Sequence, residues 1–229
     1  MQPNTILFII CINDESIYQQ ARRQIDNLLV PPGFTVEVMP IRQASSMTSA
    51  YNRALEHTAK YKIYIHQDTF IVYKNMLIEL IALFLRYPEL GMIGLAGCVT
   101  VPSNGIWWED SSLVGQVIEH RRETYQLLRF ENGWHESEEY IRVQAIDGFF
   151  MATQVDVPWR EDLFDGFHFY DTSQSLEIQR AGYVVGVPVV RSSWCIHYNG
   201  DDFDYVAYEK YRTIFVNNYF SDADHARGE

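Results

Sequence analysis

The 229-residue chain is poor in cysteine and in positive charge. Its three cysteines, Cys11, Cys98 and Cys195, are odd in number and form no CxxC pair, which argues against a zinc ribbon or a disulfide framework. Asp and Glu number 30 against 18 Lys and Arg, and no basic stripe occurs. Nucleic-acid binding depends on such a stripe, because affinity comes from counterion release at phosphates. We therefore expect no nucleic-acid partner.

Long apolar runs and several catalytic fingerprints are also missing. No stretch reaches the ~18 apolar residues of a membrane span. The amino terminus lacks the basic region of a signal sequence. The GxSxG elbow of serine hydrolases and the glycine fingerprints of Rossmann and P-loop proteins are absent. We expect a soluble, cytoplasmic protein and leave peripheral membrane contact and the oligomeric state open.

What the sequence does contain is an alternation of apolar runs with helical periodicity in its first 98 residues. The run over residues 5–12 is apolar without interruption, which is typical of a strand buried on both faces of a parallel sheet. Alternation of this kind predicts an α/β fold with a doubly wound sheet, in which ligands bind outside the carboxyl ends of the strands. The expected strands cover 5–12, 35–41, 62–66 and 91–98, and the expected helices cover 13–29, 45–55 and 76–85.

The second half is less regular but contains no linker or repeat. We expect a single domain over residues 1–229. A loop over 99–110 precedes a hairpin that turns at 120–123. A strand over 141–152 is interrupted at Asp147-Gly148. A helix over 170–182, a strand over 183–190 and an amphipathic helix over 205–219 complete the pattern.

Four short motifs carry residues suited to chemistry. Asp68, in His66-Gln67-Asp68, follows a strand and is placed to bind a divalent cation that holds a diphosphate. Asp171 opens a helix among aromatic residues, which would desolvate a general base and raise its basicity. His197 ends an apolar strand and could complete a metal site. Each has a structural alternative: a turn or cap for Asp68, an N-cap for Asp171, and a buried structural role for His197.

The remaining motifs are equally open to two interpretations. Asp147-Gly148 is a common turn dipeptide, although the apolar run after it fits a bend inside a strand better than a hairpin. Trp107-Trp108 could form a stacking wall for a sugar ring or anchor its own loop.

Taken in order, these motifs resemble a family 2-type glycosyltransferase with the GT-A fold. More narrowly, the chain is similar to the streptomycin-biosynthesis-associated glycosyltransferase-like branch. The resemblance runs from Ile6 to about Phe220 and implies a GT-A-like (nucleotide-diphospho-sugar transferase) fold, a doubly wound mixed sheet with helices on both faces. The stretches that carry it are Ala50-Tyr51-Asn52, His66-Gln67-Asp68, Gly94-Leu95-Ala96-Gly97, Asp147-Gly148-Phe149-Phe150-Met151-Ala152 and Gly166–Asp171.

The resemblance implies a nucleotide-sugar donor, a glycan or small-molecule acceptor of unknown identity, and a divalent metal, Mn²⁺ or Mg²⁺. It makes residues 1–98 the nucleotide-binding half, and residues 99–229 the acceptor-side half with the C-terminal helix. Asp68 and His197 would bind the metal, and Asp171 would deprotonate the acceptor hydroxyl in an inverting transfer. Donor contacts would come from Cys11, Asn13, Glu15, Asn52, His66, Gln67, Asp68, Asp147 and Gly148. Acceptor contacts would come from Trp107, Trp108, His168 and Tyr170.

The chain departs from the family pattern at two places. The family's DxD motif begins with an acid where this chain has His66, and Gln67 stands where the branch often has Glu. Ser173 stands where the branch often has a second Asp, which leaves Asp171 without an acidic neighbour in its motif. These departures favour an alternative function: a catalytically impaired GT-A module that binds a nucleotide sugar or glycan without turnover. A nucleotidyltransferase would need a glycine-rich basic loop near the first strand, and none occurs.

Overall fold

The computed structural model describes residues 2–131, 138–198, 200 and 203–220. Its larger sheet has the strand order β2-β1-β3-β11-β5-β12-β9. β1 is parallel to β2 and β3, whereas β11 is antiparallel to both β3 and β5. The sheet is therefore mixed, as the sequence predicted. Its strands are β1 (Gln2–Ile12), β2 (Thr35–Arg42), β3 (Ala59–His66), β5 (Leu90–Gly94), β9 (Tyr140–Arg142), β11 (Phe150–Thr153) and β12 (Val184–Pro188).

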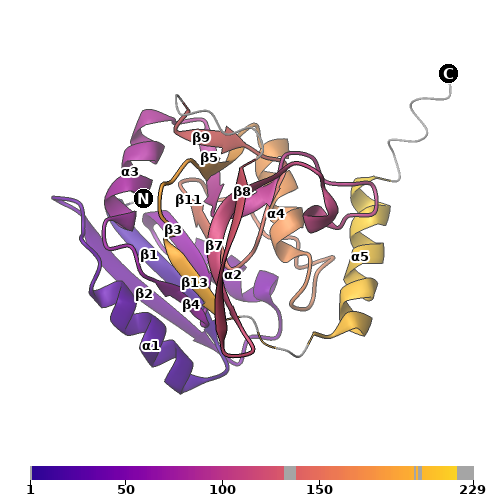
Figure 1. The fold of residues 1–229 in the computed structure, drawn as a ribbon, viewed down its shortest axis with the longest axis horizontal. Helices are drawn as coiled ribbons and strands as arrows, with labels where there is room; N and C mark the ends of the chain where they lie inside the picture. The colour runs from indigo at the N-terminus through magenta and orange to yellow at the C-terminus, as the bar shows by residue number, and fades with distance from the viewer. Residues whose placement is uncertain (1, 132–137, 199, 201–202, 221–229) are drawn as a thin grey trace.

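Helices cover both faces of this sheet (Figure 1). Ile6, Phe8 and Ile10 of β1 pack in one core cluster with α1 and α3. Leu7 and Ile9 point the other way and pack in a second cluster with α2 and α4. Successive strand residues face opposite sides, so an uninterrupted apolar run fills both cores. The helices are α1 (Glu15–Asp26), α2 (Met47–Leu55), α3 (Met76–Arg86), α4 (Tyr170–Arg180) and α5 (Tyr205–Tyr219).

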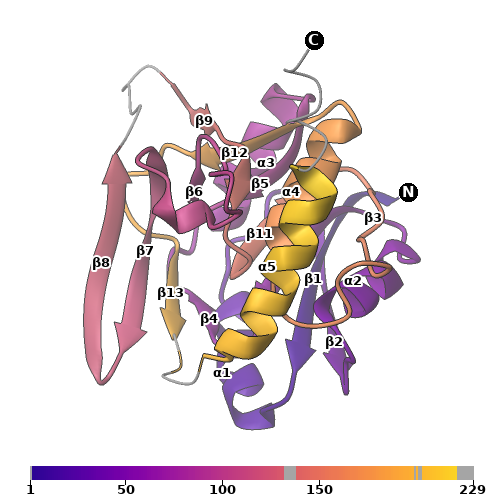
Figure 2. The same cartoon turned by 90° about the vertical axis from the view of Figure 1, so that its right-hand side faces the viewer.

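A smaller sheet begins where the larger one ends. After β3, the chain turns at residues 67 and 68 and enters β4 (Thr69–Ile71), which pairs with β13 (Cys195–Tyr198). This sheet has the order β10-β6-β7-β13-β4, and β8 (Thr124–Glu131) pairs with β7 (Leu113–Arg121). Figure 2 shows the β7–β8 hairpin standing at the side of the molecule away from α5. Its predicted turn is confirmed, with Arg122 and Glu123 both at positive φ.

Two predicted strands are divided between the sheets. The run over 91–98 forms β5 and then β6 (Ala96–Cys98), because the chain changes sheet at Leu95. A Cβ on Gly97 would lie 2.2 Å from the carbonyl oxygen of Ala145, so this crossing needs a residue without a side chain. The run over 141–152 likewise forms the end of β9, then β10 (Ala145–Ile146) and β11. The single strand expected over 91–98 was wrong, whereas the interruption expected at Asp147-Gly148 is confirmed between β10 and β11.

The predicted terminal helix is confirmed as α5, whose Phe215 is fully buried in the core. The loop over 99–110 holds a short 3-10 helix at Trp107–Glu109. Among the described residues, no helix combines the length and the apolar character needed to cross a membrane.

A buried ion pair fixes the middle of β3. The Lys62 side chain is completely buried, and its Nζ lies 2.7 Å from Oδ1 of Asp156 on the segment after β11. We expect Asp156→Ala to lower the free energy of unfolding by about 3 kcal/mol, because it leaves a buried charge without its partner. Replacing both residues by apolar ones, as in Lys62→Met with Asp156→Leu, should cost less than the single change. Urea unfolding of the three proteins measures this, and a single change costing no more than the double one would contradict it.

Candidate active site

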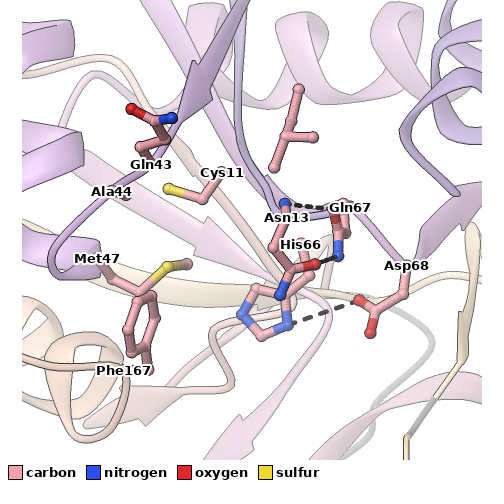
Figure 3. A pocket seen from close by; sticks show the side chains of 10 residues that line it. Cys11, Asn13, Gln43, Ala44, Met47, His66, Gln67, Asp68 and Phe167 are labelled. Atoms are coloured by element: carbon pink, nitrogen blue, oxygen red, sulfur yellow. Dashed lines mark hydrogen bonds and ion pairs between the residues drawn. The ribbon is translucent and has the colours of Figure 1, made fainter. Parts of the chain in front are cut away.

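A cavity of about 260 Å³ opens at the carboxyl ends of β1, β2 and β3 (Figure 3). Such ends are where ligands bind in open α/β sheets. Its apolar wall comes from Cys11, Met47 and Phe167, and its polar wall from the predicted residues Asn13, His66, Gln67 and Asp68. Burial raises the pKa of the Cys11 thiol to about 12, so at neutral pH it is an uncharged wall and not a nucleophile. Ile12, Gln43 and Ala44 complete the lining.

Gln67 ties two loops of this cavity together. Its side-chain oxygen accepts hydrogen bonds from the backbone N–H groups of Asn13 and Asp14, each at 3.0 Å. Its amide nitrogen donates to the side-chain oxygen of Asn13. A carboxylate at position 67 would accept the first two bonds but could not donate the third. The glutamine therefore fixes the loop after β1 against the turn after β3.

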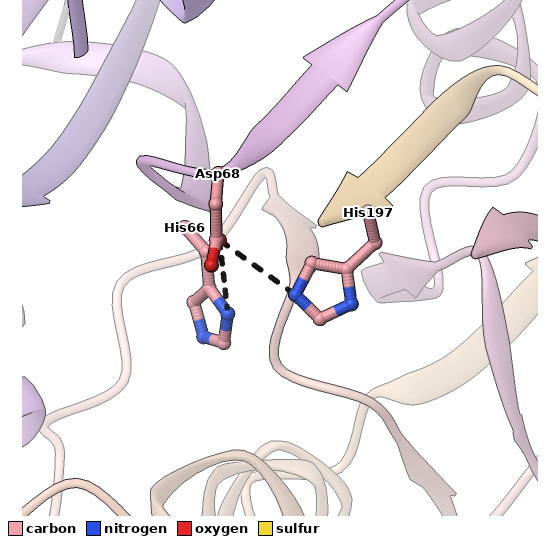
Figure 4. A group of neighbouring side chains, drawn as sticks. All are labelled: His66, Asp68 and His197. Carbon is pink, nitrogen blue, oxygen red and sulfur yellow. Dashed lines mark ion pairs between the residues drawn. The ribbon is translucent and has the colours of Figure 1, made fainter. Parts of the chain in front are cut away.

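Three side chains gather at the cavity edge to form a candidate metal cluster: His66, Asp68 and His197 (Figure 4). Asp68 Oδ1 lies 4.0 Å from His66 Nδ1 and 3.7 Å from His197 Nε2. One ligand atom from each residue falls within 4.8 Å of the others. The β4–β13 pairing sets His197 opposite Thr69, beside Asp68, which brings together residues far apart in the chain.

The cluster has the electrostatics of a cation site. Asp68 Oδ1 is buried and has no hydrogen-bond donor among the described residues. Burial raises the Asp68 pKa, and His66 opposes that shift. Burial, with His66 second, lowers the His197 pKa to about 3, so its imidazole is neutral at pH 7. An unpaired carboxylate oxygen facing the neutral imidazole of His197 fits a divalent cation. The sequence identified Asp68 and His197 for this role but placed His66 with the donor.

Tyr170 lies behind the cluster. It was expected on the acceptor side, but its side chain is buried, and its hydroxyl is hydrogen bonded to His66 Nε2. A Cβ on Gly148 would lie 2.1 Å from that hydroxyl. The glycine of the Asp147-Gly148 motif thus leaves the space through which Tyr170 reaches His66.

Asp171 is the second chemical feature of the site. Its Oδ2 accepts a 2.9 Å hydrogen bond from the Gly148 N–H, and its Oδ1 accepts one of 2.8 Å from Thr172 N–H. The N-cap of α4 is Phe169, so the N-cap alternative for Asp171 was wrong. Burial raises the Asp171 pKa, while the hydrogen bond from Thr172 and the nearby His66 oppose this. A desolvated carboxylate with free lone pairs is suited to accept a proton.

Asp171 also has an acidic neighbour, contrary to the expectation from its own motif. Burial, and secondly the charge of Asp171, raise the Asp147 pKa to about 7. The two acids are 24 positions apart in sequence, and β11 brings them together. Ser173 occupies the position where the branch often has a second Asp, and its hydroxyl donates a hydrogen bond to the Tyr170 carbonyl.

Several predicted contacts lie outside the cavity lining. Glu15 is exposed and forms an ion pair with Arg42 at 3.0 Å. The Asn52 side chain bonds the backbone N–H and carbonyl of Trp159. The contacts of Glu15 and Asn52 with a nucleotide-sugar donor stay predictions. The sequence analysis missed Gln43, whose φ of 55° is unusual for a non-glycine residue and occurs here at the end of β2, on the ligand-binding edge.

Aromatic side chains gather on the α5 side of Asp171. Trp107 is buried, whereas Trp108 is 45% exposed and its ring centroid lies 5.4 Å from that of Tyr208. The rings of His168, Phe203 and Tyr208 form a triangle, with the His168 centroid 5.4 Å from that of Phe203 and 5.6 Å from that of Tyr208. Burial lowers the His168 pKa and raises the Tyr208 pKa, and the charge of Asp171 is the second contribution to each.

The raised pKa of Asp147 predicts a pH-dependent stability. Between the ordinary pKa of 3.8 and about 7, the folded state keeps a proton that the unfolded state has lost, so stability falls as pH rises. Asp147→Asn cannot ionise and removes that loss. We expect its free energy of unfolding, relative to the natural protein, to be higher at about pH 8 than at about pH 5 by on the order of 1 kcal/mol or more. Urea unfolding at both pH values measures it, with the exposed Asp26→Asn as control. A difference that does not change with pH would contradict the prediction.

Comparisons with known proteins agree with this geometry. A family model described as "Glycosyltransferase like family" matches residues 7–219. The structure of GalNAc-T7 with UDP, GalNAc and Mn²⁺ resembles this one with a TM-score of 0.61 and 10% identity, over 93% of this chain and 48% of that one. S. aureus TarS 1-349 in complex with UDP-GlcNAc gives a TM-score of 0.53 and 8% identity, over 87% and 60%. The search of curated proteins found no match.

At these identities the two solved structures bear on the fold, and this chain spans only about half to three-fifths of their lengths. Both are GT-A glycosyltransferase structures, and the mixed sheet with helices on both faces is the architecture that the sequence predicted. The family model, in turn, covers nearly the whole chain. The protein therefore belongs to the glycosyltransferase-like family and has the GT-A fold.

Proposed function

We propose that this protein transfers a sugar from a nucleotide-sugar donor to an acceptor hydroxyl. The observation that carries the proposal is that a candidate metal cluster and a candidate base lie next to each other. The candidate metal cluster and the buried carboxylate of Asp171 are joined through Gly148, whose N–H binds Asp171 and whose missing side chain admits Tyr170 to His66. Glycosyl transfer needs both: charge neutralisation at the leaving group and a base at the nucleophile. The motif resemblance also supports membership of the streptomycin-biosynthesis-associated branch.

The donor would occupy the cavity beside β1, with its diphosphate toward the metal cluster. GalNAc-T7 binds UDP and Mn²⁺, and TarS binds UDP-GlcNAc, which supports a uridine diphosphate sugar as the donor. Asp68 and His197 would hold the cation, with His66 beside them. A divalent cation bound there supplies positive charge against the departing diphosphate. Gln67 would hold the loop after β1 and the turn after β3 in place around the nucleotide.

Asp171 would act as the general base. It takes the proton of the acceptor hydroxyl as that oxygen forms its bond to the anomeric carbon. The bond between the anomeric carbon and the diphosphate oxygen breaks, and the nucleoside diphosphate leaves with the electron pair. Attack on the face opposite the leaving group inverts the anomeric centre. Asp147, whose pKa is raised to about 7, would carry less negative charge at neutral pH than an ordinary aspartate does.

The acceptor would lie against the aromatic side chains near α5. Trp108 and Phe203 expose their rings, and His168 lies next to Asp171. Flat apolar faces beside a hydroxyl-deprotonating group suit the C–H face of a sugar ring. This supports a carbohydrate acceptor within the broader class of glycans and small molecules.

The impaired module stays a second candidate, because the metal cluster holds one carboxylate where the family motif has two. Two measurements separate the candidates. A thermal-shift titration with UDP, GDP, CDP and dTDP, each with and without Mn²⁺, identifies the nucleotide that binds. Release of that nucleoside diphosphate from its sugar then reports turnover. Binding without release, with a range of acceptors, would favour the impaired module.

Replacement of the base gives a sharper prediction. Asp171→Asn keeps the size of the side chain and can still accept the Gly148 hydrogen bond. It cannot take a proton, so transfer should fall by about 10²–10⁴-fold while the manganese-dependent thermal shift with the nucleotide is retained. Asp26→Asn, on the exposed face of α1, serves as the matched control and should leave both unchanged. Full transfer activity in Asp171→Asn would refute the assignment of Asp171 as base.

A further inference from the structure

We propose that the outer edge of β8 is an interface between two copies of this chain, which pair their β8 strands antiparallel about a two-fold axis at Leu127. The proposal concerns the assembly of the protein and does not depend on the proposed function. It follows from the backbone of β8, from the side chains that β8 exposes and from the charge of the β7–β8 hairpin.

The first observation is an open backbone edge. β8 is eight residues long, and among the described residues it pairs only with β7, in a register that is regular from end to end. The turn sets Arg121 opposite Thr124, the first of the hydrogen-bonded pairs that alternate along an antiparallel ladder. The N–H and C=O groups of Tyr125, Leu127 and Arg129 therefore point away from β7, toward the open edge.

The other sheet edges in the described part of the chain are short or guarded. β4 and β9 have three residues each and β10 has two, while β2 carries Pro40 in its interior. Short length and proline are two means by which edge strands avoid pairing. β8 contains no proline and exposes Tyr125 and Leu127 by 58% and 53%. Its two charges, Arg129 and Glu131, pair with each other at 2.7 Å. β8 is therefore the edge best suited to receive another strand.

The charge of the hairpin favours a second copy as the occupant. The whole chain has a formal charge of −12, so two copies repel each other over most of their surfaces. Residues 113–131, which form β7, the turn and β8, contain three arginines and three glutamates, and their net formal charge is zero. The hairpin stands at the side of the molecule away from α5 (Figure 2). Two acidic molecules can therefore approach each other at this neutral segment.

A two-fold axis at Leu127 makes the edge complementary to itself. Antiparallel pairing about this axis sets Leu127 opposite the second copy's Leu127, and Tyr125 opposite the second copy's Arg129. Both pairs join residues whose backbone groups face the open edge, as the ladder requires. The pairing covers two exposed leucines and sets a guanidinium beside a tyrosine ring twice. A strand already held in a hairpin also loses less entropy on binding than a free peptide does.

The small size of this interface sets the strength of the dimer. One pair of eight-residue strands covers less surface than the roughly 1,200 Å² at which stable complexes begin, so the dimer should dissociate on dilution. Because the pairing is isologous and uses up the open edge of both copies, assembly should stop at two.

Sedimentation velocity and hydrogen exchange of the natural protein provide the test. Between about 5 and about 500 µM the protein should pass from monomer to dimer. Amide exchange in the peptide that covers residues 124–131 should slow by at least about threefold over the same range. A monomer at every concentration would overturn the proposal and leave an extended segment of another protein as the occupant. Assemblies larger than two, or a dimer protected elsewhere and not at β8, would overturn it as well.

Opposite charges at position 125 test the pairing itself. Tyr125→Arg and Tyr125→Glu both remove the ring, but the first sets a like charge against the second copy's Arg129 and the second an opposite charge. Dimerisation should be weaker in Tyr125→Arg than in Tyr125→Glu by at least about fivefold. Repulsion between two acidic chains alone predicts the reverse order, since the arginine lowers the overall negative charge. Equal dimerisation of the two variants, or the reverse order, would overturn pairing about Leu127.

A charge on the axis gives the second variant test. Leu127→Lys should weaken dimerisation by at least about tenfold, because two ammonium groups would meet at the axis. The side chain is exposed in the single chain, so the substitution should leave the fold unchanged. Leu85→Lys is the matched control, since Leu85 is an exposed leucine on α3, and it should dimerise like the natural protein. Undiminished dimerisation of Leu127→Lys would overturn the proposal.

Discussion

The contact of the Tyr170 hydroxyl with His66, across the place where Gly148 has no side chain, is the constraint on which the site depends. Tyr170 begins α4, His66 ends β3, and Gly148 precedes β11, so one contact fixes three elements relative to one another. The Gly148 N–H then holds Asp171, one residue after Tyr170. His66 of the candidate metal cluster and the proposed base Asp171 are thereby positioned by the same two segments, the start of α4 and the turn at Gly148.

The topology makes this meeting possible. β11 runs antiparallel to β3, so its amino-terminal end lies at the carboxyl end of β3, where ligands bind. The chain leaves β3 for the smaller sheet directly after His66, and that change of sheet carries Asp68 to β13 and His197. An all-parallel sheet would place the start of β11 at the opposite edge. The reversed strand β11 therefore brings Asp147 and Gly148, which precede it, to the same edge of the sheet as His66.

The sequence predicted where helices and strands lie in the chain better than it predicted which strands pair and which segments come into contact. Apolar runs and helix caps located β1, β2, β3 and α1 to α4, because burial on both faces leaves a strong pattern. The same pattern does not say which sheet a strand joins, so the crossings at Leu95 and Asp147-Gly148 were missed. The approach of Asp147 to Asp171 and the burial of Tyr170 depend on contacts between distant segments, which no local motif contains. Asp68 and His197, which strand ends marked as ligand positions, lie together in the candidate metal cluster, and the donor contact expected of His66 stays a prediction.

The pairing of β4 with β13 also determines when, during synthesis of the chain, the candidate metal cluster can be completed. The candidate metal cluster takes its first residue from position 66 and its last from position 197, so about 130 further residues are synthesised before all three side chains are present. Most of the lining of the cavity, by contrast, comes from residues 11–68. A chain interrupted before β13 would lack His197 and would leave the candidate metal cluster with two of its three residues. The candidate metal cluster can therefore be complete only after β13 has been synthesised and has paired with β4.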